Sequence, residues 1–305
     1  MTSFCIASPH KNVLWYDYQL YVNLKQELQA LGFQYRSASR NRIYFLGAPQ
    51  LQFYPEVGKF DSSVNNIAVL YSHAEKLQAL NQFNQVFVCS EGVKRLLNKK
   101  RLLGFELFKK DKPFTARTAI EILRPFSSLK PSNHLMPKYD CDISFIGTPR
   151  IRPILEEALP IAHAMGLKIK IYGPNWDQYQ GNALAMRYWV ANSVPYTDIP
   201  KLAKGSKICL IDHHESMNQI GAVSHKYVDF VMAGAFVISD NNRDAVRHYK
   251  GLCFNKNLPL DTLISKYLED SAQRRSHVTR QQKIIAEQTT LHAAQKIAEY
   301  FVNDE

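Results

Sequence analysis

The feature that most constrains the fold is an alternation of strand-like and helix-like segments that runs through the chain twice. The first set contains the apolar runs FCIAS, NRIYFLG, NIAVLYS and QVFVCS, with the amphipathic segment YDYQLYVNLKQELQALGF after the first of them. The second set contains DISFIGT, KIKIYG, KICLID and AFVISD, with the helix-like segment ILEEALPIAHAMG after the first. Strands that alternate with helices favour a parallel sheet with helices on both faces. The sequence therefore predicts two α/β domains with doubly wound sheets.

The Pro- and Ser-rich stretch LRPFSSLKPSNHLMPKY separates the two sets and is typical of a linker. We expect an N-terminal domain over residues 1–130, a second domain over residues 131–285 and a final helix over residues 286–305. In the second domain, Gly234 lies between apolar residues at helical spacing and a short apolar run. This order predicts a helix that ends at a left-handed glycine, followed by an interior strand.

The composition of the 305-residue chain, 46% hydrophobic and 21% charged, is that of a globular protein. The longest nearly uncharged apolar run is far shorter than the roughly 20 residues of a transmembrane helix, and MTSFCIASPHKN lacks the apolar core of a signal peptide. Five cysteines without short paired spacings argue against a zinc site or a redox motif. We expect reduced thiols and a cytoplasmic protein, with peripheral attachment at the inner face of the membrane as a further expectation.

The formal charge of +11 is concentrated in the first half of the chain. Residues 1–138 contain 19 Lys and Arg against 9 Asp and Glu, a net +10, and much of the excess lies in KRLLNKKRLLGFELFKKDK. Basic residues interleaved with leucines can lie on an anionic membrane surface or hold nucleic-acid phosphates. The alternative is a solvated helix face.

Glycines and polar residues follow the predicted strands of the second domain. Because ligands of parallel sheets bind at the carboxyl ends of the strands, we select the residues at these ends as candidates for ligand binding: Gly147, Arg150, Tyr172, Gly173 and Trp176. Alternatively, the glycines serve only to form tight turns, and Trp176 is an aromatic cap on the domain.

Three further candidates, His225, Lys226 and Asp229, lie within two turns at the start of a mostly buried helix. A helix N-terminus favours negative charge, and Lys226 or His225 would add positive charge for a diphosphate. Asp229 would accept hydrogen bonds from ribose hydroxyls, or would be a buried structural carboxylate paired with one of the two cations. This helix face therefore predicts a nucleotide site.

The sequence gives little support for a metal centre. The adjacent His213 and His214, with Glu215, are residue types that bind metal ions. Two neighbouring histidines on one loop do not easily face one ion, however. We therefore expect neither a metal nor a cofactor.

Five segments in the second half carry a resemblance to a known family, through their order and approximate spacing: DISFIGTPR, IYGPNW, LAKGSKICL, HKYVDFVMAGAFVISD and QTTLHAAQKI. Over roughly residues 140–300 the chain resembles the C-terminal half of the glycosyltransferase group that includes the spore-maturation protein CgeB, within the glycosyl transferases group 1. The resemblance implies the GT-B fold, in which two Rossmann-like domains face a cleft and the final helix returns toward the first domain.

The resemblance also implies roles for individual residues. It places Lys226 against the donor diphosphate and Asp229 against the ribose, at positions where the family commonly has Arg and Glu. Related retaining enzymes have a second Glu eight residues earlier, where this chain has Gly221, so the stereochemical course stays open. The implied reaction is metal-independent transfer of a sugar from a nucleotide sugar to a glycan or glycolipid, as in cell-surface polysaccharide biosynthesis.

An inverting reaction would need a base from the first domain. The candidates by position are His10, Asp17 and His73, and Asp17 has the alternative role of a charge at a helix N-terminus. Two other functions stay open: a nucleic-acid-binding protein without transfer chemistry, and an inactive nucleotide-sugar-binding module. Because the nucleotide-site pattern lies in the neutral half and the basic stretch has no regular aromatics, we expect no nucleic-acid partner.

Overall fold

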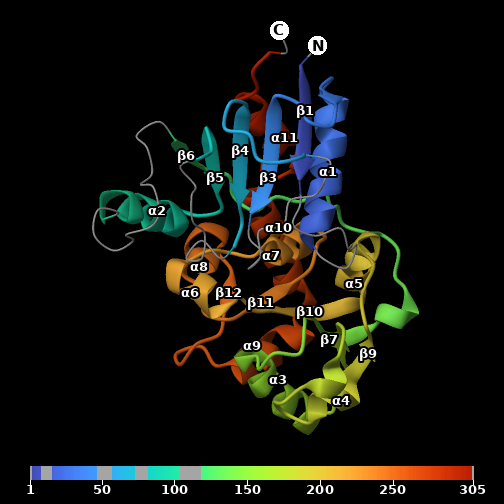
Figure 1. The fold of residues 1–305 in the computed structure, drawn as a ribbon. Helices are drawn as coiled ribbons and strands as arrows, with labels where there is room; N and C mark the ends of the chain where they lie inside the picture. The colour runs from blue at the N-terminus through green and yellow to red at the C-terminus, as the bar shows by residue number, and fades with distance from the viewer. Residues whose placement is uncertain (1, 8–15, 47–56, 73–81, 104–117, 304–305) are drawn as a thin grey trace. The chain divides into compact units, whose positions relative to one another are not determined.

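The computed structural model describes residues 2–7, 16–46, 57–72, 82–103 and 118–303. Over these residues the chain forms two six-stranded sheets with helices against them (Figure 1). The chain folds as two compact units: unit 1 comprises Met1–Ser128, Glu215–His225 and Glu287–Glu305, and unit 2 comprises Leu129–His214 and Lys226–Ala286. The predicted α/β class with two Rossmann-like sheets is confirmed.

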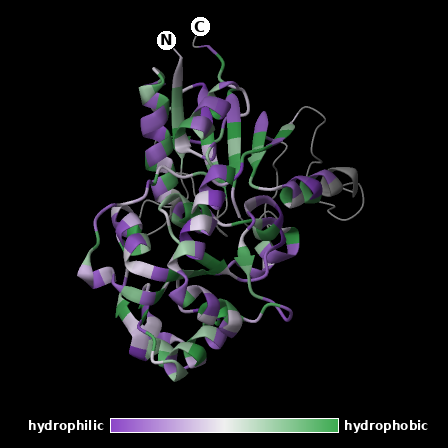
Figure 2. Cartoon of the chain, turned by 180° about the vertical axis from the view of Figure 1, so that it is seen from behind, coloured by the Kyte–Doolittle hydropathy of each residue, from purple (hydrophilic) through white to green (hydrophobic). Residues whose placement is uncertain are grey.

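Unit 1 is built on a parallel sheet whose strands follow the order β2 (Gln34–Tyr35), β1 (Ser3–Ala7), β3 (Asn41–Leu46), β4 (Asn65–Leu70), β5 (Gln85–Val88) and β6 (Ala119–Ile122). The residues of β1 and β3 are buried along their whole length, as expected for parallel strands covered on both faces. Figure 2 shows hydrophobic residues along these strands and a mixture of hydrophobic and hydrophilic residues along the helices.

The helices of unit 1 are α1 (Tyr16–Ala30), α2 (Glu91–Leu103), α6 (Glu215–Ile220) and α11 (Thr290–Ala298). Helices α1 and α11 pack together, and Leu24 of α1 shares a buried cluster with Ile297 of α11. Residues 215–225 group with unit 1, although the sequence pattern places them in the second domain, because Met217 and Ala222 are buried in the cluster that contains Leu97 of α2.

Unit 2 has the strand order β12 (Leu252–Cys253), β11 (Val237–Ser239), β10 (Ser206–Ile211), β7 (Cys141–Ile146), β8 (Ile169–Tyr172) and β9 (Trp189–Ala191), with parallel pairing throughout. The chain runs outward from β7 to β8 and β9 and then returns to place β10 on the other side of β7. The strand order therefore reverses between β7 and β10, the position at which open parallel sheets form a ligand crevice.

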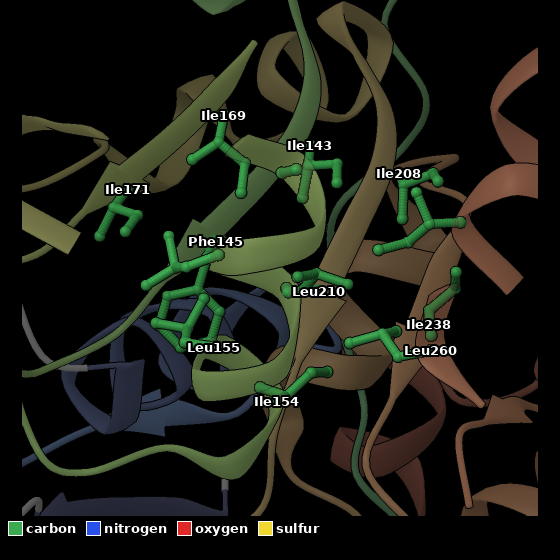
Figure 3. Packing of buried hydrophobic residues seen from close by; sticks show 14 of the residues in the cluster. Ile143, Phe145, Ile154, Leu155, Ile169, Ile171, Ile208, Leu210, Ile238 and Leu260 are labelled. Atoms are coloured by element: carbon green, nitrogen blue, oxygen red, sulfur yellow. The ribbon is translucent and has the colours of Figure 1, made fainter. Parts of the chain in front are cut away.

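The core of unit 2 lies between one face of this sheet and the helices α3 (Pro153–Ala164) and α9 (Leu260–Glu269). Figure 3 shows Leu210 of β10 close to Ile154 of α3 and Leu260 of α9, and Ile143 of β7 belongs to the same buried cluster. The remaining helices of unit 2 are α4 (Leu184–Tyr188), α5 (Ile199–Gly205), α7 (His225–Met232), α8 (Arg243–Tyr249) and α10 (Ser271–Ile284).

The stretch around Gly234 forms as predicted. Helix α7 ends at Met232, Gly234 has a φ of +88°, and β11 begins at Val237. Near the start of the same helix, Lys226 lies at the carboxyl end of β7. None of the helices in the described part of the chain combines the length and the apolar character of a transmembrane span.

Candidate functional site

Three cationic side chains surround one carboxylate at the point where the strand order of unit 2 reverses. Asp212 follows β10 directly, and its side chain is only 3% exposed. Arg152 Nη1 lies 2.6 Å from both Asp212 oxygens, Arg150 Nη2 lies 2.7 Å from Oδ2, and Lys226 Nζ lies 3.7 Å from Oδ1. Three positive charges against one negative charge leave a net +2, so the cluster is suited to a polyanion.

Lys226 is held at the end of β7. Its Nζ donates a hydrogen bond of 2.8 Å to the carbonyl oxygen of Ile146 and lies 5.1 Å from the centroid of the Phe145 ring. Burial lowers the pKa of Lys226 to about 8, although the nearby Asp212 raises it. The ammonium is therefore charged at neutral pH and loses its proton in mildly alkaline solution.

The loops after β7 and β8 approach each other so closely that glycine is required. A Cβ at Gly173 would lie 1.9 Å from the carbonyl oxygen of Gly147, and Gly173 has a φ of +143°. A Cβ at Gly147 would lie 2.7 Å from Arg152 Nη2. These two predicted residues therefore shape the site by bringing the backbone and Arg152 together.

The two predicted aromatics, Trp176 and Tyr172, are both buried. The Trp176 side chain is buried in the core of unit 2, where its Nε1 donates to the carbonyl oxygen of Gly147 at 2.9 Å. The Tyr172 side chain is also buried, with its ring 6.1 Å from that of Tyr139. In this structure Trp176 supports the loop at Gly147, and the contact of either aromatic with a ligand stays a prediction.

Asp229 and His225 lie on α7, but the structure places them in different surroundings. Asp229 is 3% exposed and accepts a hydrogen bond of 2.9 Å from the Tyr196 hydroxyl. His225 groups with unit 1, where its ring lies edge-on to the rings of Tyr71 and Phe126. Burial lowers the pKa of His225 to about 3. The buried ring is therefore neutral at pH 7, and a contact of His225 with a ligand stays a prediction.

His213 is hydrogen-bonded to Asp240, at the end of the neighbouring strand β11. Its Nδ1 lies 2.6 Å from Asp240 Oδ1, and its backbone N–H donates to Oδ2 of the same residue. Within the described residues, no group of three or more His, Cys, Asp and Glu side chains is placed to hold a metal ion. Metal independence nevertheless stays a prediction.

The proposed catalytic bases lie mostly outside the described residues. His10 and His73 fall in segments that the structure does not describe, and Asp17 lies in the first turn of α1 without a described side chain. The prediction that one of them is the base therefore stays open.

Sequence reasoning missed two members of the cluster, Arg152 and Asp212. Both follow predicted strands, Arg152 two residues after Arg150 and Asp212 directly after KICLI. Position at a strand end was therefore a signal for each. Their pairing was hidden, because the two residues are 60 positions apart in the chain.

Two doubly wound parallel sheets, the second with a cationic cluster at its switch point, are the arrangement expected of the GT-B fold. Residues 150–299 match the sequence model of the family described as Glycosyl transferase-like. The predicted resemblance is confirmed: the second half of the chain matches a glycosyltransferase family, and the chain has the GT-B fold. No curated protein shows significant similarity to the chain.

Solved structures of glycosyltransferases share this fold over nearly the whole chain. An α-glucosyltransferase in complex with UDP has a TM-score of 0.65 at 8% identity and covers 98% of this chain and 100% of its own. The T4 phage β-glucosyltransferase in complex with UDP-glucose has a TM-score of 0.59 at 10% identity, with 98% and 97% covered. A trehalose-6-phosphate synthase has a TM-score of 0.59 at 13% identity, with 93% and 76% covered. At these identities the likeness shows the fold.

Proposed function

We propose that the protein transfers a sugar from a nucleoside-diphosphate sugar, and that the cluster around Asp212 binds the diphosphate. The observation that carries the proposal is the net +2 charge of Arg150, Arg152, Lys226 and Asp212 at the switch point of unit 2. Two of the solved structures with this fold hold UDP or UDP-glucose, which makes uridine diphosphate the first nucleotide to test.

The three cations have different parts in this proposal. Arg152 is buried and points at Asp212 and Thr148, so it supports the loop. Arg150 and Lys226 are 37% and 24% exposed and are the groups that contact phosphate oxygens. Asp229, held by Tyr196, accepts hydrogen bonds from the ribose.

Sugar transfer requires positive electrostatic potential around the diphosphate leaving group. When the bond between the sugar and the diphosphate breaks, negative charge builds on the diphosphate, and fixed cations stabilise that charge in the transition state. Arg150 and Lys226 supply it without a metal ion. A base from the first domain, His10, Asp17 or His73, would serve an inverting reaction.

For the acceptor we propose a glycan or glycolipid under assembly at an anionic membrane surface. The net +10 of residues 1–138 supports this assignment, since each basic residue near such a surface contributes on the order of 1 kcal/mol. Sedimentation with anionic and neutral vesicles at low salt tests it. Equal recovery with both lipids would rule out the membrane, and salt-sensitive binding to duplex DNA would point to a nucleic acid instead.

The donor assignment is tested with Lys226→Ala and a control of equal charge. Lys207 lies at the opposite end of β10, where it pairs with Asp142 at 2.8 Å. We expect Lys226→Ala to weaken UDP binding about ten- to a hundredfold, the cost of a charge-assisted hydrogen bond, and to leave the fold intact. Lys207→Ala should bind UDP as the wild type does. Isothermal titration gives both affinities, and equal losses in the two variants would contradict the proposal.

A further inference from the structure

We propose that Asp212 is a positioning residue of the donor site: it acts as a built-in anion that holds Arg150 and Lys226 in place until a diphosphate takes over as their partner. The inference rests on the proposed function and adds a residue that the sequence motifs did not identify. It starts from the unequal way in which the three cations pair with one carboxylate.

Arg152 is held in place by Asp212 and Thr148. Its Nη1 contacts both Asp212 oxygens at 2.6 Å, its Nε donates to the Thr148 carbonyl at 2.8 Å, and its Nη2 donates to Thr148 Oγ1 at 3.2 Å. The side chain is 5% exposed. A ligand would have to break the contact of Arg152 Nη1 with both Asp212 oxygens before it could bind Arg152. We therefore assign Arg152 to holding Asp212.

Arg150 and Lys226 are held more loosely. Arg150 uses Nη2 for both of its contacts, 2.7 Å to Asp212 Oδ2 and 3.1 Å to the His213 carbonyl. Lys226 Nζ lies 3.7 Å from Asp212 and has its short hydrogen bond with the neutral carbonyl of Ile146. A guanidinium has five N–H donors and an ammonium has three, so both retain donors for phosphate oxygens.

The carboxylate is needed because the cations repel one another. Burial raises the pKa of Asp212, but Lys226, Arg152 and Arg150 outweigh burial and hold it below its ordinary value, so Asp212 is ionised at neutral pH. Without this charge, three cations would face one another at the ends of β7 and β10 with no carboxylate among them. A diphosphate carries more negative charge than the Asp212 carboxylate, so it can replace Asp212 as the partner of Arg150 and Lys226.

The proposal predicts a specific effect on Lys226. The groups that act on its ammonium are Asp212 and Asp240, which raise its pKa, and Arg152 and Arg150, which lower it together with burial. Replacing Asp212 by the neutral, isosteric Asn removes the main raising influence. Lys226 should then lose its proton at lower pH than in the wild type, and donor binding should weaken at correspondingly lower pH.

The test is a titration of UDP into wild type and Asp212→Asn between pH 6 and pH 9. We expect wild-type affinity to fall above about pH 8, and the fall to occur at lower pH in Asp212→Asn. As the pH rises from 6 to 8, the UDP affinity of Asp212→Asn should fall about tenfold more than that of the wild type, because one charge-assisted contact is lost. A uniform loss at every pH, with an unchanged midpoint and a lower melting temperature, would show that Asp212 merely ties the two loops together and would overturn the proposal.

Two further variants complete the test. Asp142→Asn removes a carboxylate at the amino end of β7, where Asp142 pairs with Lys207, and should leave the pH profile of UDP binding unchanged. Lys226→Arg should bind without the alkaline fall, because a guanidinium does not titrate below pH 12, and it keeps the proposal testable if Asp212→Asn does not fold. An alkaline fall that persists in Lys226→Arg would overturn the proposal. Absence of nucleotide binding by the wild type at pH 6 would instead remove the proposed function itself.

Discussion

At the residue scale, burial decides which polar groups of α7 are available for chemistry. Lys226 keeps part of its side chain exposed, whereas His225 and Asp229 are almost fully buried. The spacing of these residues along the helix was visible in the sequence, but the degree of burial depends on neighbours such as Tyr196, Tyr71 and Phe126. Sequence spacing therefore predicts which residues share the helix, whereas their charge depends on how the helix is packed.

Asp229→Ala tests the ribose assignment against a purely structural role. A ribose contact exists in the ground state and the transition state alike, so its loss acts on binding more than on turnover. We expect UDP affinity to fall about ten- to a hundredfold in protein that is still folded at the assay temperature. Tyr196→Phe serves as the comparison, because it removes the hydrogen bond to Asp229 and leaves the carboxylate. If folded Asp229→Ala binds UDP with unchanged affinity, the ribose role is contradicted.

His225 makes the stability of the protein sensitive to acid. Burial lowers the pKa of His225 to about 3, while the unfolded chain has a histidine pKa of about 6.5. The unfolded state therefore binds more protons below about pH 6.5, and the native state loses stability as the pH falls from there toward 3. We expect the melting temperature of His225→Leu to fall less than that of the wild type between pH 7 and pH 4.5. Parallel curves for the two proteins would contradict this role.

At the scale of elements, the pattern of strands and helices in unit 2 was predictable, whereas the contacts between its loops were not. Runs such as DISFIGT and KICLID mark buried strands by composition alone. The pairing of Arg152 with Asp212, and the contact of Gly173 with Gly147, depend on β7 lying between β8 and β10. Strand order is a property of the packed sheet, which no local pattern specifies.

Gly173→Ala should show how tightly the two loops are packed. The added Cβ would lie 1.9 Å from the Gly147 carbonyl oxygen at a backbone φ of +143°, so strain and overpacking act together. We expect a loss of roughly 2–5 kcal/mol in the free energy of unfolding. Gly166→Ala is the matched control, since Gly166 also has a positive φ, +67°, but open space around its Cβ position. Its loss should be about 1 kcal/mol, and urea unfolding compares the two.

At the scale of the whole molecule, the end of the chain belongs to the unit in which the chain begins. The segment after α11 reaches the amino ends of β3 and β4, where Asn41 Oδ1 accepts from the Val302 N–H and Asn41 Nδ2 donates to the Val302 carbonyl, both at 2.8 Å. Asn65 Nδ2 donates to the Tyr300 carbonyl at 2.7 Å, and the Phe301 ring stacks on that of Phe4. The hydrogen bonds join residues that are 261 and 235 positions apart in the sequence.

The fully buried Asn41 should therefore be a major source of stability for unit 1. Replacing it by Ala leaves the N–H and C=O of Val302 without this partner and also removes a hydrogen bond to the Ser3 carbonyl. We expect a loss of roughly 2–4 kcal/mol in the free energy of unfolding, measured by urea denaturation. Val302→Ala is the control, because it keeps both backbone hydrogen bonds and shortens a side chain that is 41% exposed.

A truncation after Ala298 separates the C-terminal contacts of Asn41 from its other roles. If Asn41 acts mainly by holding the last segment, Asn41→Ala should cost much less in the truncated chain than in the full chain, because its partner Val302 is already gone. The difference between the two costs is the coupling energy of a double-mutant cycle. An equal cost in both chains would assign the effect of Asn41 to Ser3 and Asn65 within the sheet, and the C-terminal segment would then contribute to unit 1 through its other contacts, such as those of Tyr300 and Phe301.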